Sequence, residues 1–102
     1  MKYRALPRFL TDYRKLSASE KARFRDAFAR FINACKEYED NPQHYVWPAS
    51  LRIEKLAGTG IMAMTGSFSG PDGRATFQFE TVEGEMFVLW RRVGRHSVYA
   101  EP

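Results

Sequence analysis

The chain has 102 residues, 44% of them hydrophobic and 27% charged, which predicts one ordinary globular domain spanning residues 1–102. No apolar segment is long enough for a membrane span, and the single cysteine, Cys35, excludes an internal disulfide. Because the N-terminal residues lack the apolar core of a signal peptide, we expect a cytoplasmic protein. The formal charge of +4, with eleven arginines against five lysines, favours an anionic partner.

The first forty residues predict a short strand followed by two helices. Residues 2–6 are a candidate edge strand, which Pro7 ends. Residues 8–16 carry apolar side chains at helical spacing. The segment from Ser17 to Glu20 fits a capping box and predicts a second helix over residues 18–38. Its apolar stripe includes Cys35, which we therefore interpret as a packing residue. This helical hairpin needs another layer to cover its apolar surface.

The second half of the chain predicts that layer. After a loop with two prolines and an aromatic cluster that we expect to cap the core, four strands are expected at residues 51–56, 61–68, 74–81 and 86–93. Residues 74–81 alternate between apolar and polar side chains, and residues 86–93 are nearly all apolar, as in an interior strand. We therefore predict an α+β fold with an N-terminal short strand and helical hairpin packed on a C-terminal antiparallel meander.

Basic and titratable residues gather at the ends of the predicted strands. Arg52 and Lys55 flank the first, Arg74 opens the third, and the end of the last carries Arg91, Arg92, Arg95, His96 and Tyr99. Several cations around one histidine favour an anion-binding site, for which RNA phosphate is the leading candidate. No spacing of His, Cys and acidic residues predicts a metal site.

Three segments carry a resemblance to a known family. They are Leu51-Arg-Ile-Glu-Lys-Leu-Ala-Gly-Thr-Gly-Ile61, Gly73-Arg-Ala-Thr-Phe77 and Arg92-Val-Gly-Arg-His-Ser-Val-Tyr99. In this order, behind a basic helical hairpin, they make the chain similar to the RelE/ParE superfamily of toxins from bacterial toxin–antitoxin pairs. The resemblance implies a RelE/ParE-like fold and a cognate antitoxin as partner, with acidic residues facing the basic surface.

The nuclease branch of that superfamily implies an mRNA endoribonuclease that works at the A site of the 70S ribosome and needs no metal or cofactor. The resemblance assigns catalytic roles to His96, Arg74, Lys55 and Tyr99. We predict that Arg52, Arg92 and Arg95 bind the substrate. In this chemistry the 2′-hydroxyl attacks the neighbouring phosphorus while one group accepts its proton, another protonates the leaving 5′-oxygen, and cations stabilise the added charge. This hypothesis requires His96 and Arg74 on the same side of the sheet.

Two departures from the family pattern keep other functions open. The stretch Ile61–Gly66 has no cation, although many nuclease members carry one there. The two-residue period places Glu54 and Arg52 on one face of their strand and Lys55 on the other, and it turns Arg91 and Arg92 to opposite faces. The alternatives are a ParE-like toxin that poisons DNA gyrase and a degenerate member that only binds an antitoxin. At the residue level, the alternatives are that His96 and Arg74 are solvated surface residues and that Tyr99 is a C-terminal anchor.

Overall fold

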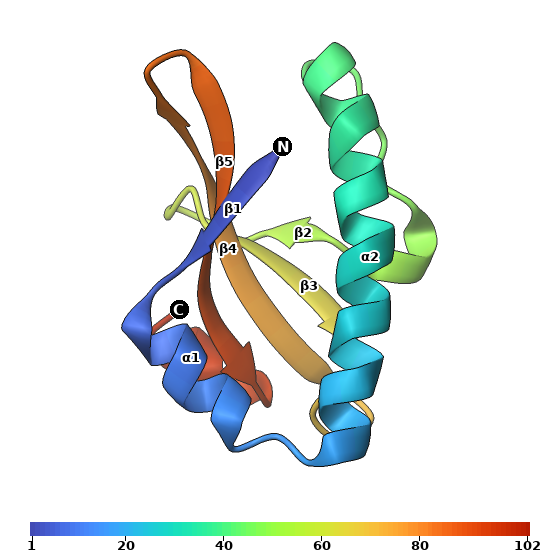
Figure 1. Ribbon diagram of the computed structural model, residues 1–102, viewed down its shortest axis with the longest axis vertical. Helices are drawn as coiled ribbons and strands as arrows, with labels where there is room; N and C mark the ends of the chain where they lie inside the picture. Colours follow the sequence, from blue (N-terminus) through green and yellow to red (C-terminus); the bar gives the residue numbers. More distant parts are fainter.

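The computed structural model describes all 102 residues as two helices on one five-stranded sheet (Figure 1). The predicted α+β class is confirmed. The elements in chain order are β1 (Lys2–Ala5), α1 (Pro7–Arg14), α2 (Ala18–Asp40), the 3-10 helix η1 (Ala49–Leu51), β2 (Glu54–Lys55), β3 (Met62–Gly66), β4 (Gly73–Val82), β5 (Glu85–Gly94) and the 3-10 helix η2 (His96–Ala100).

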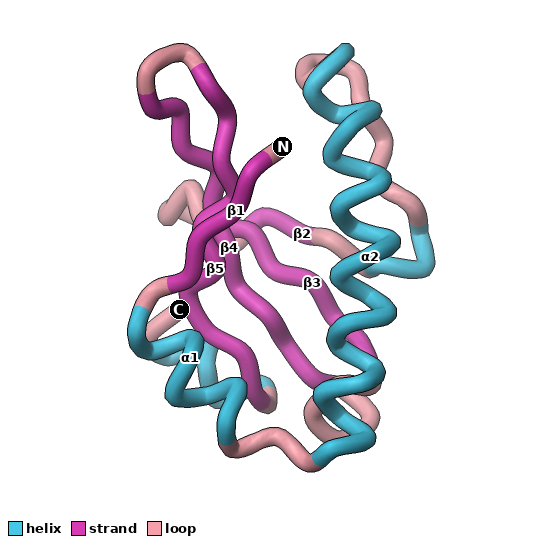
Figure 2. The backbone as a smooth tube through the Cα atoms, in the orientation of Figure 1, coloured by secondary structure: helices cyan, strands magenta, loops and turns pink.

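The sheet has the strand order β1-β5-β4-β3-β2. Strands β2 to β5 form the antiparallel meander expected from the sequence, and the hairpin of β4 and β5 extends beyond the other strands (Figure 2). The N-terminal strand β1 lies beside β5 and runs parallel to it, from Lys2 opposite Phe87 to Ala5 opposite Trp90. The two ends of the chain therefore meet in the sheet, with β5 in its interior.

Local sequence signals set the helix boundaries. Pro7 is the first residue of α1, where its missing N–H costs nothing. At the start of α2, the Ser17 hydroxyl accepts from the Glu20 amide and the Glu20 carboxylate accepts from the Ser17 amide, so the predicted capping box is present. Both helices pack on the same face of the sheet, and no helix is long and apolar enough to cross a membrane.

The core is a cluster of aromatic rings between the helices and the sheet. Trp90 on β5 is 1% exposed and contacts rings from α1, α2 and β4, with centroids 5.3 Å away for Phe31 and for Phe77. Trp47, from the loop after α2, stacks on Tyr38 and Phe31 and closes the core, as predicted for that loop. Cys35 is fully buried, and burial raises the pKa of its thiol to about 12, which suits a packing residue.

The predicted strand over residues 51–56 is wrong in extent. Pro48 precedes a 3-10 turn that buries Leu51, and Arg52 then adopts a left-handed conformation with a φ of 48°. These two departures from extended backbone leave only Glu54 and Lys55 to pair with β3. The final titratable residues also lie outside the strand, because β5 ends at Gly94 and the chain turns into η2.

A bulge in β5 overturns the prediction that Arg91 and Arg92 point to opposite faces. Thr76 lies opposite Arg92 and the next residue, Phe77, lies opposite Trp90, so Arg91 is an extra residue in the ladder. The bulge breaks the two-residue alternation. Both guanidinium groups consequently reach the last two residues of the chain, Arg91 at the carbonyl of Pro102 and Arg92 at the carbonyl of Glu101.

Candidate functional site

The strand register separates two faces of the sheet. Residues directly opposite one another share a face, so Met62, Phe77 and Trp90 line the face that the helices cover. The other face, which we call the open face, carries Glu54 opposite Ala63 and Arg74 opposite Thr65. The helix η2 packs over this open face at the end of β5, held by the buried side chain of Val98.

On the open face, η2 brings three of the predicted site residues together. The ring centroids of His96 and Tyr99 are 4.8 Å apart, and the Arg74 guanidinium carbon lies 5.6 Å from the centroid of the Tyr99 ring. His96 is exposed, whereas Tyr99 and Arg74 are half-buried. We call these three residues the His96 cluster. Its geometry meets the requirement that the imidazole and the Arg74 guanidinium lie on the same side of the sheet.

The Tyr99 hydroxyl donates a hydrogen bond to Glu54 Oε1 at 3.0 Å. Burial, then this hydrogen bond and the negative charge of Glu54, raise the pKa of Tyr99, while Arg74 acts in the opposite direction. The phenol is therefore protonated at neutral pH and can serve as a proton donor. Glu54, which the two-residue period predicted on one face with Arg52, is thus the partner of Tyr99.

Arg74 and Arg52 meet through Asp72, in the turn before β4. The Arg74 Nη1 donates to the carbonyl of Asp72 at 2.8 Å, and Nη1 of Arg52 lies 3.5 Å from the Asp72 carboxylate. The left-handed backbone of Arg52 directs the chain from η1 into β2 at this point. Arg74 Nε is buried without a hydrogen-bond partner, and Nη2 also makes no hydrogen bond within the chain, so this guanidinium retains an unused donor.

Arg92 is tied to the scaffold. Its guanidinium forms a two-point ion pair with Asp12 of α1, with distances of 2.6 and 3.3 Å, and this contact raises the pKa of Arg92. Arg92 Nη1 also donates to the carbonyl of Glu101, and Arg91 and Thr76 donate to the carbonyl of Pro102. These hydrogen bonds hold the C-terminal segment on the open face. Arg92 thus joins α1, β5 and the C-terminal segment, and its charge is balanced by Asp12.

Lys55 and Arg95 are not brought into contact with the His96 cluster. Lys55 lies opposite Met62, in register with the helix-covered face, whereas its neighbour Glu54 lies on the open face. No hydrogen bond or ion pair links Lys55 to Arg74, Tyr99 or His96. Arg95 is exposed, and its Nε lies toward Gly70 in the turn between β3 and β4.

The charges around the His96 cluster are nearly balanced. Arg74 and Arg52 supply two positive charges, and Glu54 and Asp72 supply two negative ones. The cluster of cations expected from the sequence is therefore divided, because Arg91 and Arg92 are occupied by the C-terminal segment and Asp12. What remains at the site is one accessible imidazole, one protonated phenol and one guanidinium with an unused donor.

Structural comparison identifies the architecture. A YoeB/ParE toxin from Agrobacterium tumefaciens aligns over 94% of this chain and 99% of its own, with a TM-score of 0.53 and 12% sequence identity. A chain of the intact E. coli RelBE toxin–antitoxin complex aligns over 92% and 94%, with a TM-score of 0.52 and 17% identity. The chain has a RelE/ParE-like fold. No family model and no curated protein sequence matches it. The similarity therefore lies in the RelE/ParE-like architecture, and the roles of individual residues rest on the contacts described above.

Proposed function

We propose that this protein is the toxin of a toxin–antitoxin pair and acts as a metal-independent endoribonuclease on mRNA at the ribosome. The RelE/ParE-like fold supports the toxin class. The observation that carries the nuclease activity is the contact of Arg74, Tyr99 and His96 on the open face. These are a phosphate-binding cation, a proton donor and a proton acceptor, the three functions that cleavage by a 2′-hydroxyl requires.

In the proposed reaction, His96 accepts the proton of the 2′-hydroxyl as its oxygen forms a bond to phosphorus. Arg74 stabilises the negative charge that develops on the non-bridging oxygens through Nη2, which makes no hydrogen bond within the chain. The bond from phosphorus to the 5′-oxygen breaks, and the Tyr99 phenol protonates that oxygen. Arg74 lies against the ring and stabilises the resulting phenolate. The products are a 2′,3′-cyclic phosphate and a 5′-hydroxyl end.

The binding residues form a smaller set than the sequence predicted. Arg52 and Arg74 both contact Asp72 and so lie close together. This position supports a role for Arg52 in binding the phosphate next to the scissile one. Arg95 is exposed beside the turn at Gly70 and remains a candidate for an outlying contact. We leave Lys55 out of the proposed chemistry because it lies in register with the helix-covered face, and we leave Arg92 out because it is paired with Asp12.

Mapping of new RNA ends after expression of the chain tests this proposal. We expect cuts in phase with codons that carry 5′-hydroxyl ends, and a loss of roughly 10²–10⁴-fold in cleavage for His96→Ala and for Arg74→Ala, the usual scale of acid–base and electrostatic contributions. Lys55→Ala should cleave within a few-fold of wild type. Cleavage that survives the loss of both His96 and Arg74 would refute the assignment.

An antitoxin is the second part of the proposal. The E. coli neighbour is a toxin–antitoxin complex, and the basic surface of this chain favours an acidic partner segment. Co-expression with products of adjacent genes should restore growth to cells that express the chain. The suppressing protein should bind the purified chain less tightly as salt increases, because exposed charges are screened. If no adjacent gene product suppresses toxicity, the pairing is rejected.

Inhibition of DNA gyrase is a second candidate function, favoured by a specific observation. Strand β3 carries no cation, and the charges around the His96 cluster are nearly balanced, so the site is less basic than the sequence predicted. A supercoiling assay run beside the RNA mapping separates the two functions. Intact mRNA with blocked supercoiling would support the gyrase poison. Inactivity in both assays, without toxicity, would support a member that only binds an antitoxin.

A further inference from the structure

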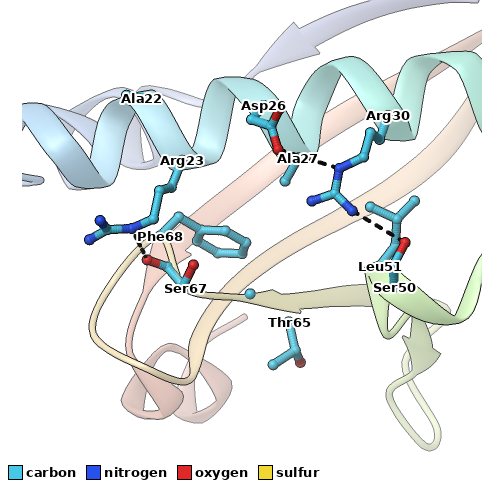
Figure 3. Close-up of a pocket in the computed structure, with 11 residues that line it drawn as sticks. Ala22, Arg23, Asp26, Ala27, Arg30, Ser50, Leu51, Thr65, Ser67 and Phe68 are labelled. Atoms are coloured by element: carbon cyan, nitrogen blue, oxygen red, sulfur yellow. Dashed lines mark hydrogen bonds and ion pairs between the residues drawn. The ribbon is translucent and has the colours of Figure 1, made fainter.

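A groove of about 390 Å³ lies between α2 and β3, away from the His96 cluster. Figure 3 shows Arg23 at one end of the groove and Arg30 at the other, both extending from α2 toward the sheet, with Asp26 between them. Strand β2 pairs only with Met62 and Ala63, so the end of β3 at Thr65 and Gly66 is an uncovered edge that opens into the groove.

Both arginines are held in place but retain free donors. Arg23 Nε donates to the carbonyl of Ser67 at 2.6 Å, and its two Nη groups have no partner in the chain. Arg30 Nη1 donates to the Ser50 hydroxyl at 3.2 Å, its Nε lies 3.5 Å from the Asp26 carboxylate, and its Nη2 has no partner. Two cations against one carboxylate leave the groove with a net positive charge. A guanidinium that is oriented through some of its nitrogens and has at least one other free is suited to binding an anion.

A series of contacts connects this groove to the His96 cluster. Arg30 contacts Ser50 in η1, and the residue that follows η1 is Arg52. Arg52 pairs with Asp72, whose carbonyl accepts from Arg74. Guanidinium groups therefore follow one another from Arg74 past η1 and around the uncovered edge of β3 to Arg30 and Arg23.

We propose that this groove binds the phosphate backbone of the RNA whose scissile bond lies at the His96 cluster, with Arg23 and Arg30 each holding a phosphate. The inference rests on the proposed function and defines the path of its substrate. The two arginines are seven positions apart, which at a rise of about 1.5 Å per residue is roughly 10.5 Å along α2. That spacing fits two phosphates of one backbone better than one small anion. An RNA strand that reaches the groove has to extend well beyond the phosphodiester bond that is cut.

The test measures binding of a 5′-fluorescein-labelled single-stranded RNA of about twenty nucleotides by anisotropy at several salt concentrations. All proteins carry His96→Ala so that the RNA stays intact. Each phosphate contact on a single strand contributes about 0.7 to the slope of log Kobs against log salt. We expect Arg23→Gln with Arg30→Gln to reduce the slope by about 1.4, and Arg23→Lys with Arg30→Lys to restore most of it because the charges return.

The matched control is Arg14→Gln with Lys36→Gln, which removes one exposed charge from α1 and one from α2, both outside the groove. Its slope should equal that of the parent. Equal slopes for groove and control variants would overturn the proposal, as would a loss in the groove variant that the lysine pair fails to restore. A tetranucleotide that fills only the His96 cluster should bind the parent and the groove variant alike. If wild type cleaves RNA but the groove variants bind RNA like the parent, only this inference is rejected. If the groove variants lose RNA binding but wild type does not cleave, the proposed nuclease is rejected, and the groove remains an RNA-binding site without a scissile bond at the His96 cluster.

Discussion

The environment of Tyr99 on the open face shifts the pKa of its phenol. Burial and the hydrogen bond to Glu54 both raise the pKa of the phenol. The folded chain therefore keeps the proton of Tyr99 at a pH at which the unfolded chain has lost it. The resulting contribution to stability is complete below the ordinary tyrosine value of about 10 and disappears as the pH rises above it.

Tyr99→Phe separates the hydroxyl from the ring. The substitution keeps the contacts of the ring with His96 and Arg74 and removes the donor to Glu54. If Tyr99 protonates the leaving oxygen, RNA cleavage should fall by about 10²–10⁴-fold, whereas the free energy of unfolding at pH 7 should fall by only about 1 kcal/mol. Single-turnover cleavage and urea unfolding of the same preparations provide the two measurements.

Tyr45→Phe is the matched control. The hydroxyl of Tyr45 donates to Glu37 at 3.1 Å, and burial together with Glu37 raises the pKa of this phenol also. Both variants should lose less stability than wild type between pH 9 and pH 11, but only Tyr99→Phe should lose activity. Equal activity in the two variants would exclude Tyr99 as the proton donor.

At the scale of elements, Glu20 fixes the start of α2 against the sheet. One carboxylate oxygen accepts from the amide of Ser17 in the capping box, and the other accepts from the amide of Gly70 at 3.0 Å, in the turn between β3 and β4. These amides, with that of Ser17 first, lower the pKa of Glu20. A single charged side chain thus links a local helix signal to a contact fifty residues away.

Glu20→Gln should destabilise the protein in a pH-dependent way. Because the pKa of Glu20 is lowered in the folded chain, its contribution is present above the ordinary value of 4.5 and is lost as the pH falls. We expect wild type to exceed the variant in urea stability at pH 7, and the difference to narrow by pH 3. Glu83→Gln, in an exposed turn, should show no difference at either pH. A gap at pH 3 as large as at pH 7 would exclude the charge of Glu20 as its origin.

The elements that the sequence predicted well are those with local signals. The capping box at Ser17 and the alternation through Phe77 and Phe79 each lie within a few residues, and the structure contains both. The bulge at Arg91 and the left-handed residue Arg52 carry no such local signal. Likewise, the parallel pairing of β1 with β5 joins residues more than eighty positions apart. Such features depend on the assembled sheet.

The contrast between local signals and long-range contacts also explains which parts of the candidate site could be predicted. Motif order and titratable residue types were sufficient to select His96, Tyr99 and Arg74, which the structure places in contact. Their carboxylate partners were not predicted, because Glu54 meets Tyr99 across 45 positions and Asp12 meets Arg92 across 80. A sequence shows how many cations a chain has, but the fold determines which of them are neutralised.

At the scale of the whole molecule, Trp90 connects both helices to the sheet. Its ring contacts those of Phe9 on α1, of Phe24, Phe28 and Phe31 on α2, and of Phe77 on β4. Its indole N–H is buried without a hydrogen-bond partner. The residue at the centre of the core therefore combines extensive apolar contact with one unsatisfied donor.

These two features of Trp90 predict different results for two substitutions. Trp90→Ala should cost about 3–5 kcal/mol through the cavity it leaves. Trp90→Phe also loses packing, but it removes a buried donor whose lack of a partner costs about 1–3 kcal/mol, so its net effect should be far smaller. Urea unfolding followed by far-UV circular dichroism measures both. If Trp90→Phe destabilises the protein as much as Trp90→Ala, the indole N–H has a partner, and ordered water is then the physical explanation.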